Sequence, residues 1–323
     1  MKRLLLSICA VATLASCSMD EVVSYDKGEV IGFANPFVNK STRADDAVDP
    51  SYGGGNSLTQ FNVWGTANDV AIYDGDVVSG TVGSGEWTCT EKNYWVKNVS
   101  YKFAALAGYG AATVVLDNGL PTSITNFNAS EANVDLIYAT ETATGADSNN
   151  AVALTFNHLL SKVKFSVVNN SAAEDLCSFK ITNIKINGKK IGTATLPEVG
   201  VTPATATWDT SSADLADYTI SDITVAKGVE SAECASELLL IPGSFDISFS
   251  VETYYGNGQT PVDTKTYTKS SVAALTQTLA VGTAYNFIIN VSVGNEIKFS
   301  VAENPSWTSA TDNDNNANGT VIL

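Results

Sequence analysis

The sequence predicts an all-β fold, and three features of its residue pattern point to that class. Apolar and polar residues alternate with period two in several stretches, of which Phe245–Glu252 is the clearest, and such alternation is typical of strands with one buried face. Residue pairs that favour tight hairpin turns, such as Asn118-Gly119 and Asn187-Gly188, separate the stretches. Beyond the N-terminus, no segment carries helical periodicity over any length. Short half-buried strands with frequent turns are typical of antiparallel sandwiches.

Other strands follow from the same alternation. Val163, Phe165 and Val167 alternate with the polar residues Lys162, Lys164 and Ser166, so an apolar and a polar face are expected there. The same pattern recurs near the C-terminal end, at Tyr285, Phe287, Ile289, Val291 and Val293, and again at Ile297, Phe299 and Val301. A further turn is predicted at Gly256-Asn257-Gly258.

Acidic residues dominate the charge of the chain. Its 323 residues include 34 Asp and Glu against 18 Lys and Arg, giving a net charge of −16. Such a chain repels phosphate backbones, so no nucleic-acid partner is expected. The single histidine, His158, is expected to be structural, with its ring bonded to the backbone or to a neighbouring side chain. Because catalysis and metal binding usually recruit several such groups, we expect neither an enzyme nor a cofactor.

The N-terminus has the form of an export signal. Met1-Lys2-Arg3 is positively charged, Leu4–Leu14 is apolar, and Leu14-Ala15-Ser16-Cys17 follows. The last four residues resemble the lipobox of bacterial lipoproteins, in which the signal peptide is removed before the cysteine and the thiol is acylated. The resemblance implies a signal peptide over residues 1–16 and lipidation at Cys17, and acyl chains would hold the precursor on a membrane.

Three more cysteines remain in the mature chain: Cys89, Cys177 and Cys234. This odd number allows at most one disulfide among them, with one thiol left over. Buried free thiols are an equally good interpretation, so the cysteines do not define the fold.

A polar stretch over residues 140–150 is the best candidate for a break between domains. We therefore expect an N-terminal β-sandwich over residues 44–155 and a C-terminal one over residues 156–323. Residues 17–43 form a separate leader with a short strand-like piece. Residues 311–319 are almost wholly polar and are expected to form a solvated tail.

Four segments together resemble the fimbrillin family, the type V pilins of outer-membrane-bearing anaerobes. The segments are Leu154–Val163, which is similar to the family's F-x-H-x-L-S-K-V strand; Leu238–Pro242; Leu279–Phe287 with Ile297–Phe299 and Trp307; and Ile31–Phe33 with Thr42-Arg43-Ala44. Each segment is weakly specific alone, but the set spans nearly the whole chain and agrees with the lipobox.

The resemblance implies two transthyretin-like β-sandwich domains in tandem and a structural subunit of cell-surface fimbriae. The subunit would lie in the stalk, or at the tip as an accessory, and would support adhesion to a host or bacterial surface ligand. Its precursor would be a lipoprotein of the cell outer membrane. An arginine-specific protease would cut between Arg43 and Ala44 and release the first strand. The chain has only two arginines, Arg3 and Arg43.

Removing one strand from a sandwich exposes unpaired backbone groups and an apolar slot, which can accept a strand from another subunit. Val30 (or Ile31) and Phe33 are expected to fill that slot before cleavage. Burying each of two such side chains is worth about 1.5–3 kcal/mol. The candidate donor strand is the C-terminal segment Val321-Ile322-Leu323. The partners implied are other fimbrial subunits.

The tryptophans Trp64, Trp87, Trp95 and Trp208 suggest an alternative function. If exposed, they could form a sugar-stacking platform. The protein would then be an outer-membrane surface lipoprotein that binds glycans in a nutrient-uptake complex, with an uncut leader. A hydrolase would need a pair of converging carboxylates, and no spacing suggests one.

Overall fold

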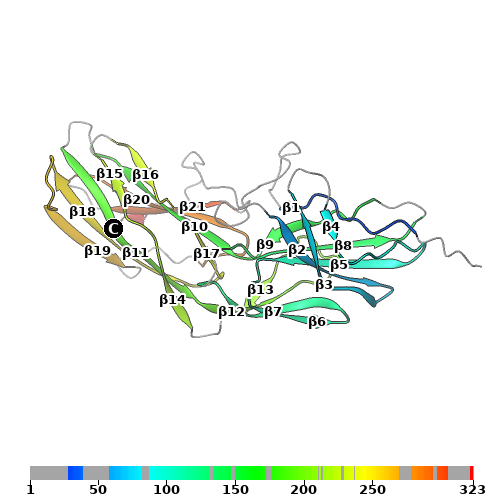
Figure 1. The fold of residues 1–323 in the computed structure, drawn as a ribbon. Coiled ribbons are helices and arrows are strands. Elements are labelled where there is room, and N and C mark those ends of the chain that lie inside the picture. Colours follow the sequence, from blue (N-terminus) through cyan, green and yellow to red (C-terminus); the bar gives the residue numbers. More distant parts are fainter. Residues whose placement is uncertain are drawn as a thin grey trace, which may run out of the picture.

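The computed structural model describes residues 28–38, 58–81, 87–130, 134–146, 150–171, 176–209, 211, 214–226, 229–235, 237–268, 278–293, 297–304 and 321–322. Throughout these ranges the chain forms strands, turns and irregular segments without a helix, which confirms the predicted all-β class. Accordingly, these ranges contain no helix that is long and apolar enough to cross a membrane. The described strands form four sheets in an elongated molecule (Figure 1).

Two sheets lie at one end of the molecule, on the right in Figure 1. The larger has the order β1-β9-β8-β5-β2-β3-β4, and the smaller has the order β13-β12-β7-β6. The larger sheet comprises β1 (Phe37–Val38), β2 (Gln60–Ala67), β3 (Val70–Gly80), β4 (Trp87–Cys89), β5 (Ser100–Ala107), β8 (Ile137–Thr144) and β9 (Thr155–His158). The smaller comprises β6 (Thr113–Asp117), β7 (Leu120–Asn128), β12 (Ile191–Thr195) and β13 (Thr207–Asp209).

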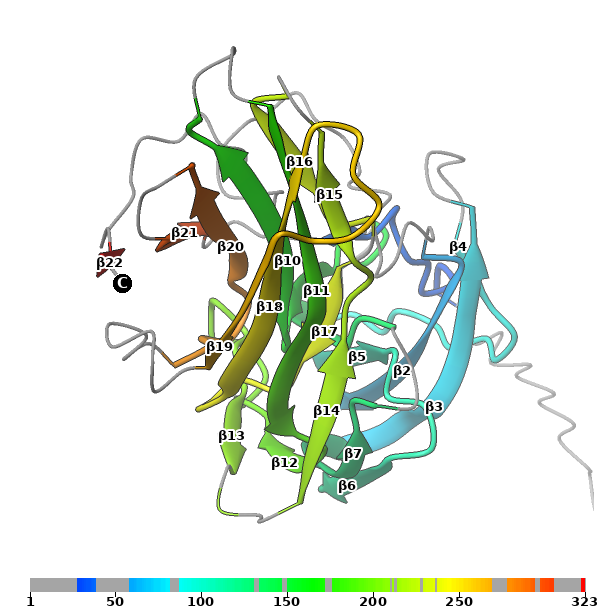
Figure 2. The same cartoon turned by 90° about the vertical axis from the view of Figure 1, so that its left-hand side faces the viewer.

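The other two sheets lie at the opposite end, which faces the viewer in Figure 2. One has the order β16-β10-β20-β21-β22 with β17 also on β10, and the other has the order β14-β11-β18-β19 with β15 also on β11. The first comprises β10 (Ser161–Asn169), β16 (Ser231–Glu233), β17 (Leu238–Leu240), β20 (Ala284–Val291), β21 (Lys298–Asn304) and β22 (Val321–Ile322). The second comprises β11 (Cys177–Lys189), β14 (Leu215–Thr219), β15 (Ile223–Val225), β18 (Asp246–Tyr255) and β19 (Asp263–Thr268).

Facing sheets are held together by apolar side chains, as expected of packed sheets. At the C-terminal end, Phe249 of β18 stacks on Phe299 of β21, with ring centroids 6.0 Å apart. At the N-terminal end, Phe127 of β7 and Trp208 of β13 belong to the same buried cluster as Trp64 of β2. This cluster runs through both ends of the molecule, so the apolar core is continuous between them.

The predicted polar face of β10 is buried, contrary to the alternation in its sequence. Lys162, Lys164 and Ser166 are all less than 9% exposed. The strand lies between β16 and β17 on one side and β20 on the other, and polar side chains of β16 and β20 contact two of these residues. The Lys164 ammonium pairs with Glu233 at 3.1 Å. The Ser166 hydroxyl donates to Asn286 Oδ1 at 2.8 Å. The pairing of β10 with β20 is parallel, although the sandwich was expected to be antiparallel.

Two of the three turn predictions are confirmed. Asn118-Gly119 forms the β6–β7 turn with positive φ at both residues, and the Gly256–Gly258 segment follows β18. The prediction at Asn187-Gly188 was wrong, because both residues lie inside β11. There Asn187 pairs with Asp246 of β18, and its amide donates to Asp217 at 2.8 Å. Strand neighbours on both sides thus outweigh the local turn preference.

The predicted domain boundary between residues 155 and 156 falls inside β9. The chain leaves the seven-stranded sheet after His158 and enters the sheet that contains β10 at Ser161. Strand β12, from the C-terminal half, pairs with β7 of the N-terminal half. Strands from both halves therefore share one sheet, and the division into two sandwich domains stays a prediction.

Candidate functional site

The candidate site is formed by residues 28–38, called the leader segment below, which precede the first long strand. In Figure 1 this segment is the blue trace that leads to β1. It lies between β4, at one end of the seven-stranded sheet, and the residues just before β9, near the other end. Phe33 forms a bridge with Trp87 of β4 on one side and with Val152, just before β9, on the other. The leader segment therefore fills the gap between the two ends of this sheet.

Backbone hydrogen bonds hold the segment from both sides. On the β4 side the Ile31 amide donates to the Asn93 carbonyl at 2.8 Å, and the Trp95 amide donates to Glu29 at 2.9 Å.

On the β9 side, the Ala34 amide donates to the Val152 carbonyl at 2.9 Å, and the Val152 amide donates to Gly32 at 2.8 Å. Phe37 and Val38 then continue as β1, parallel to β9. The segment behaves as a strand with partners on both sides, so its removal would leave two unpaired edges.

Two leader side chains belong to a separate buried cluster under the seven-stranded sheet. Ile31 and Phe33 are each 3% exposed, and both contact this cluster. The Phe33 ring packs edge-on against Phe61, Tyr73 and Phe103, with centroids 5.9–6.3 Å apart. Burial here raises the pKa of Tyr73 to about 12. The leader thus supplies part of the core on this face of the sheet.

Val30, the alternative to Ile31 in the sequence analysis, lies on the other side of the leader strand. Its side chain is 43% exposed, because neighbouring residues of a strand point to opposite faces. Of the three residues predicted to fill the slot, Ile31 and Phe33 are therefore the buried pair.

Two leader contacts were not foreseen from the sequence. The indole N–H of Trp87, a buried side chain, donates to Asn35 Oδ1 at 3.0 Å. A Cβ atom added at Gly28 would lie 2.0 Å from the Trp95 carbonyl oxygen. Trp87 and Asn35 are 52 residues apart, and nothing in local periodicity links residues so distant.

The other predicted site residues are only partly covered by the structure. Cys17, Arg43, Ala44 and Leu323 lie outside the described residues. Val321 and Ile322 form β22, which pairs antiparallel with Lys298 and Phe299 of β21 in the same chain. The candidate donor strand thus occupies an edge of its own C-terminal sheet.

Comparison with known proteins decides the family. The sequence model of the Fimbrillin-like family matches residues 42–305. The chain belongs to this family. Its members are structural fimbrial proteins and not enzymes, and fimbriae are appendages of the cell surface. A search of curated protein sequences found no match.

Solved structures share the fold of this fimbrillin-like chain. A fimbrial protein from Bacteroides vulgatus is 14% identical, with a TM-score of 0.57 over 86% of this chain and 99% of that one. A protein from Bacteroides uniformis, described as a candidate cell adhesion protein, is 16% identical, with a TM-score of 0.52 over 88% and 99% of the two chains. At these identities the similarity establishes the fold alone.

The four tryptophans of the alternative glycan-binding hypothesis do not form an exposed sugar-stacking platform in this fimbrillin-like chain. Trp64, Trp87, Trp95 and Trp208 are all at most 9% exposed and belong to the buried clusters. Trp208 even uses its indole N–H internally, donating to the Leu159 carbonyl at 2.7 Å. Core packing therefore accounts for these four residues.

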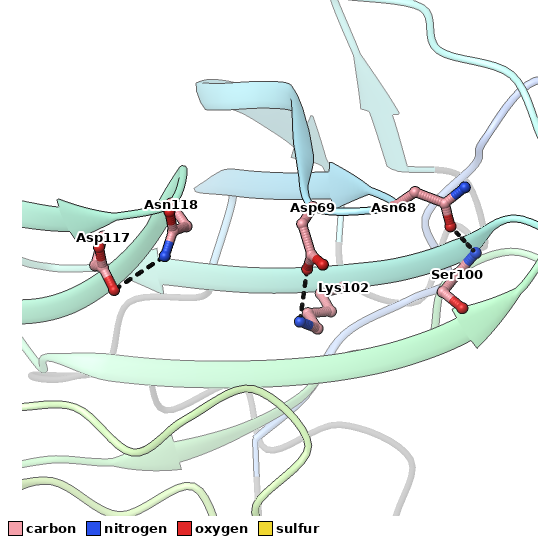
Figure 3. Close-up of polar contacts among 6 residues, drawn as sticks. All are labelled: Asn68, Asp69, Ser100, Lys102, Asp117 and Asn118. Carbon is pink, nitrogen blue, oxygen red and sulfur yellow. Dashed lines mark hydrogen bonds and ion pairs between the residues drawn. The ribbon is translucent and has the colours of Figure 1, made fainter.

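A surface hollow of about 590 Å³ lies where two hairpin turns meet. Figure 3 shows polar contacts in and beside this hollow. Lys102 pairs with Asp69 at 2.8 Å, and the Asn118 side-chain amide donates to Asp117 at 3.2 Å. Beside the hollow, the Ser100 backbone amide donates to Asn68 Oδ1 at 3.0 Å. Asn118 pairs within its own turn, and the β2–β3 turn residues Asn68 and Asp69 pair with Ser100 and Lys102 of β5. These local contacts account for the polar side chains around the hollow.

His158 is structural, as predicted. Its Nδ1 contacts the Asp135 carboxylate, and both side chains are buried where the chain passes from β9 to β10. Cys89, Cys177 and Cys234 are free thiols. Among the residues the structure describes, no group of three or more His, Cys, Asp or Glu side chains converges as a metal site would require.

Proposed function

We propose that this chain is a structural subunit of cell-surface fimbriae that assembles by strand exchange. In this proposal it is exported as a lipoprotein acylated at Cys17, and an arginine-specific protease cuts it between Arg43 and Ala44. The leader segment then leaves, and a strand from another subunit enters the slot. The assembled subunit, in the stalk or at the tip, supports adhesion.

The observation that carries the proposal is the position of the leader segment. Ile31 and Phe33 fill one buried face of the seven-stranded sheet, and backbone hydrogen bonds join the segment to its neighbours on both sides. It also precedes every long strand of the chain. One cut at Arg43, five residues after β1, would free it without breaking the chain within the sheet.

The energetics favour exchange over an empty slot. Loss of Ile31 and Phe33 exposes apolar surface worth about 1.5–3 kcal/mol for each side chain. Loss of the leader also removes the partners of the Asn93 carbonyl, the Trp95 amide and both backbone groups of Val152. An incoming strand restores both kinds of contact. The uncut leader therefore blocks assembly until the protease acts.

The C-terminal segment remains the candidate donor. To enter another subunit, Val321 and Ile322 must first leave β21. A two-residue pairing at a sheet edge involves few hydrogen bonds, so this step is expected to cost little.

The test is treatment of the purified uncut chain with an arginine-specific protease. We expect a product that begins at Ala44 and forms a ladder of oligomers that collapses on boiling. The matched control is Arg43→Lys, which keeps the charge but removes the cleavage site, and it should stay monomeric. A cut chain that remains monomeric at high concentration would refute assembly by strand exchange.

A further inference from the structure

We propose that the slot selects its incoming strand by the residues at four positions, those now held by Gly28, Ile31, Phe33 and Asn35. The inference rests on the proposed function and adds to it the chemistry of the partner. The best-fitting partner is a β-strand of another fimbrial subunit that carries a small residue, then an aliphatic, an aromatic and a hydrogen-bond acceptor. Their spacing is three, two and two residues. The C-terminal segment Val321-Ile322-Leu323 of this chain supplies only aliphatic residues, so it should fill the slot less tightly than such a strand.

The first position requires a small residue because the backbone of the slot comes too close for a side chain. A Cβ at Gly28 would lie 2.0 Å from the Trp95 carbonyl oxygen and 3.1 Å from its carbon. That carbonyl is part of the slot wall, and the neighbouring Trp95 amide bonds to the leader at Glu29. The wall therefore cannot retreat without losing the pairing, and glycine is the residue that tolerates such an approach.

The second and third positions are shaped apolar sites. Ile31 is 3% exposed within a cluster of aliphatic and aromatic side chains. Phe33 is surrounded by three aromatic rings, each at an interplanar angle above 60°. Edge-on packing of this kind favours another aromatic ring, because ring edges and faces carry opposite partial charge.

The fourth position is polar, and it distinguishes this slot from a merely apolar groove. The Trp87 indole N–H is buried and donates to Asn35 Oδ1 at 3.0 Å. A strand with an apolar residue there would leave this donor without its partner, which is costly inside a protein. A strand with an acceptor two residues after the aromatic would satisfy it.

The slot also sets the direction of the incoming strand. The leader runs parallel to β9 and to Val152, and antiparallel to Trp87 and Tyr94. A strand entered in reverse would pair the same edges with a different hydrogen-bond pattern and would exchange the positions of the small and polar residues. The four positions therefore specify direction as well as identity.

The experiment measures binding of synthetic leader peptides to the cut chain. A chain with Val321→Lys and Ile322→Lys, whose candidate donor strand can no longer fill an apolar slot, is cleaved at Arg43 and separated from its leader. A fluorescent peptide of residues 28–38 is then titrated by anisotropy. We expect the Asn35→Leu peptide to bind roughly 10-fold more weakly, and the Gly28→Ala and Phe33→Ala peptides at least as weakly. Val30→Thr is the matched control at an exposed position, and it should bind within about threefold.

A double-mutant cycle isolates the polar contact. Phenylalanine cannot donate, so in a Trp87→Phe chain the Asn35→Leu penalty should fall to within about twofold. If that chain does not fold, the peptide series on the chain that keeps Trp87 still decides the question. Equal binding of the Asn35→Leu and parent peptides would refute selection at the four positions and would leave strand exchange itself intact. If no peptide binds the cut chain, both the selection at the four positions and the proposed function are refuted.

Discussion

Replacing Phe33 by alanine in the uncut chain measures how much the leader segment stabilises the N-terminal sheet. The Phe33 ring is 3% exposed and contacts three aromatic rings at 5.9–6.3 Å. Truncating a fully buried phenylalanine costs about 3–5 kcal/mol, since it removes apolar burial and leaves a cavity. This measured range already includes the loss of aromatic contacts, which are worth about 0.5–1.5 kcal/mol for each pair. We therefore expect a loss of about 4 kcal/mol.

The assay is unfolding in guanidinium chloride, followed by tryptophan fluorescence, because Trp87 and Trp95 border the leader segment. The matched control is Val30→Ala, which alters an exposed neighbour on the same strand and should change stability by about 0.5 kcal/mol. A Phe33→Ala chain within about 1 kcal/mol of the parent would show that the leader does not contribute to the core, and the argument for a slot would fail.

Three further predictions concern residues outside the leader segment. His158→Ala should destabilise the chain by about 3–5 kcal/mol because it leaves the buried Asp135 carboxylate unpaired; a denaturation midpoint equal to the parent's would contradict this. Gly119→Ala should destabilise the chain by about 1–2 kcal/mol because its φ is +79°, and by more because the new Cβ would press on the β2–β3 hairpin. Gly256→Ala, at φ +60° with open space around it, should show only the backbone cost. Burial raises the pKa of Tyr73 from 10.0 to about 12, so its contribution to stability should be complete below pH 10 and lost as the pH rises through 12; ultraviolet titration that shows every tyrosine ionising near pH 10 would exclude this.

Strands with strict alternation could be predicted from the sequence because their two faces meet different environments. Residues of β18, β20 and β21 alternate in sequence, and all three strands were located to within a few residues. Strand β10 also alternates, but both its faces are covered. Side chains of the flanking strands β16 and β20 contact its polar residues. Because β20 lies more than 100 residues away, local periodicity does not indicate this burial.

The same distinction applies to the candidate site. The spacing of Ile31 and Phe33 places both on one face of a strand, so their joint burial could be anticipated. The choice between Val30 and Ile31 depended on register, which only the neighbouring strands determine. The Trp87–Asn35 hydrogen bond joins residues 52 positions apart, and only the assembled sheet brings them together.

The most direct test of the central proposal is the N-terminus and polymer state of the protein recovered from its own cells. The account predicts a chain that begins at Ala44 and runs as a ladder of oligomers that collapses to one band on boiling. A single monomeric species that still begins at acylated Cys17 would contradict it, and Arg43 would then be an ordinary linker residue.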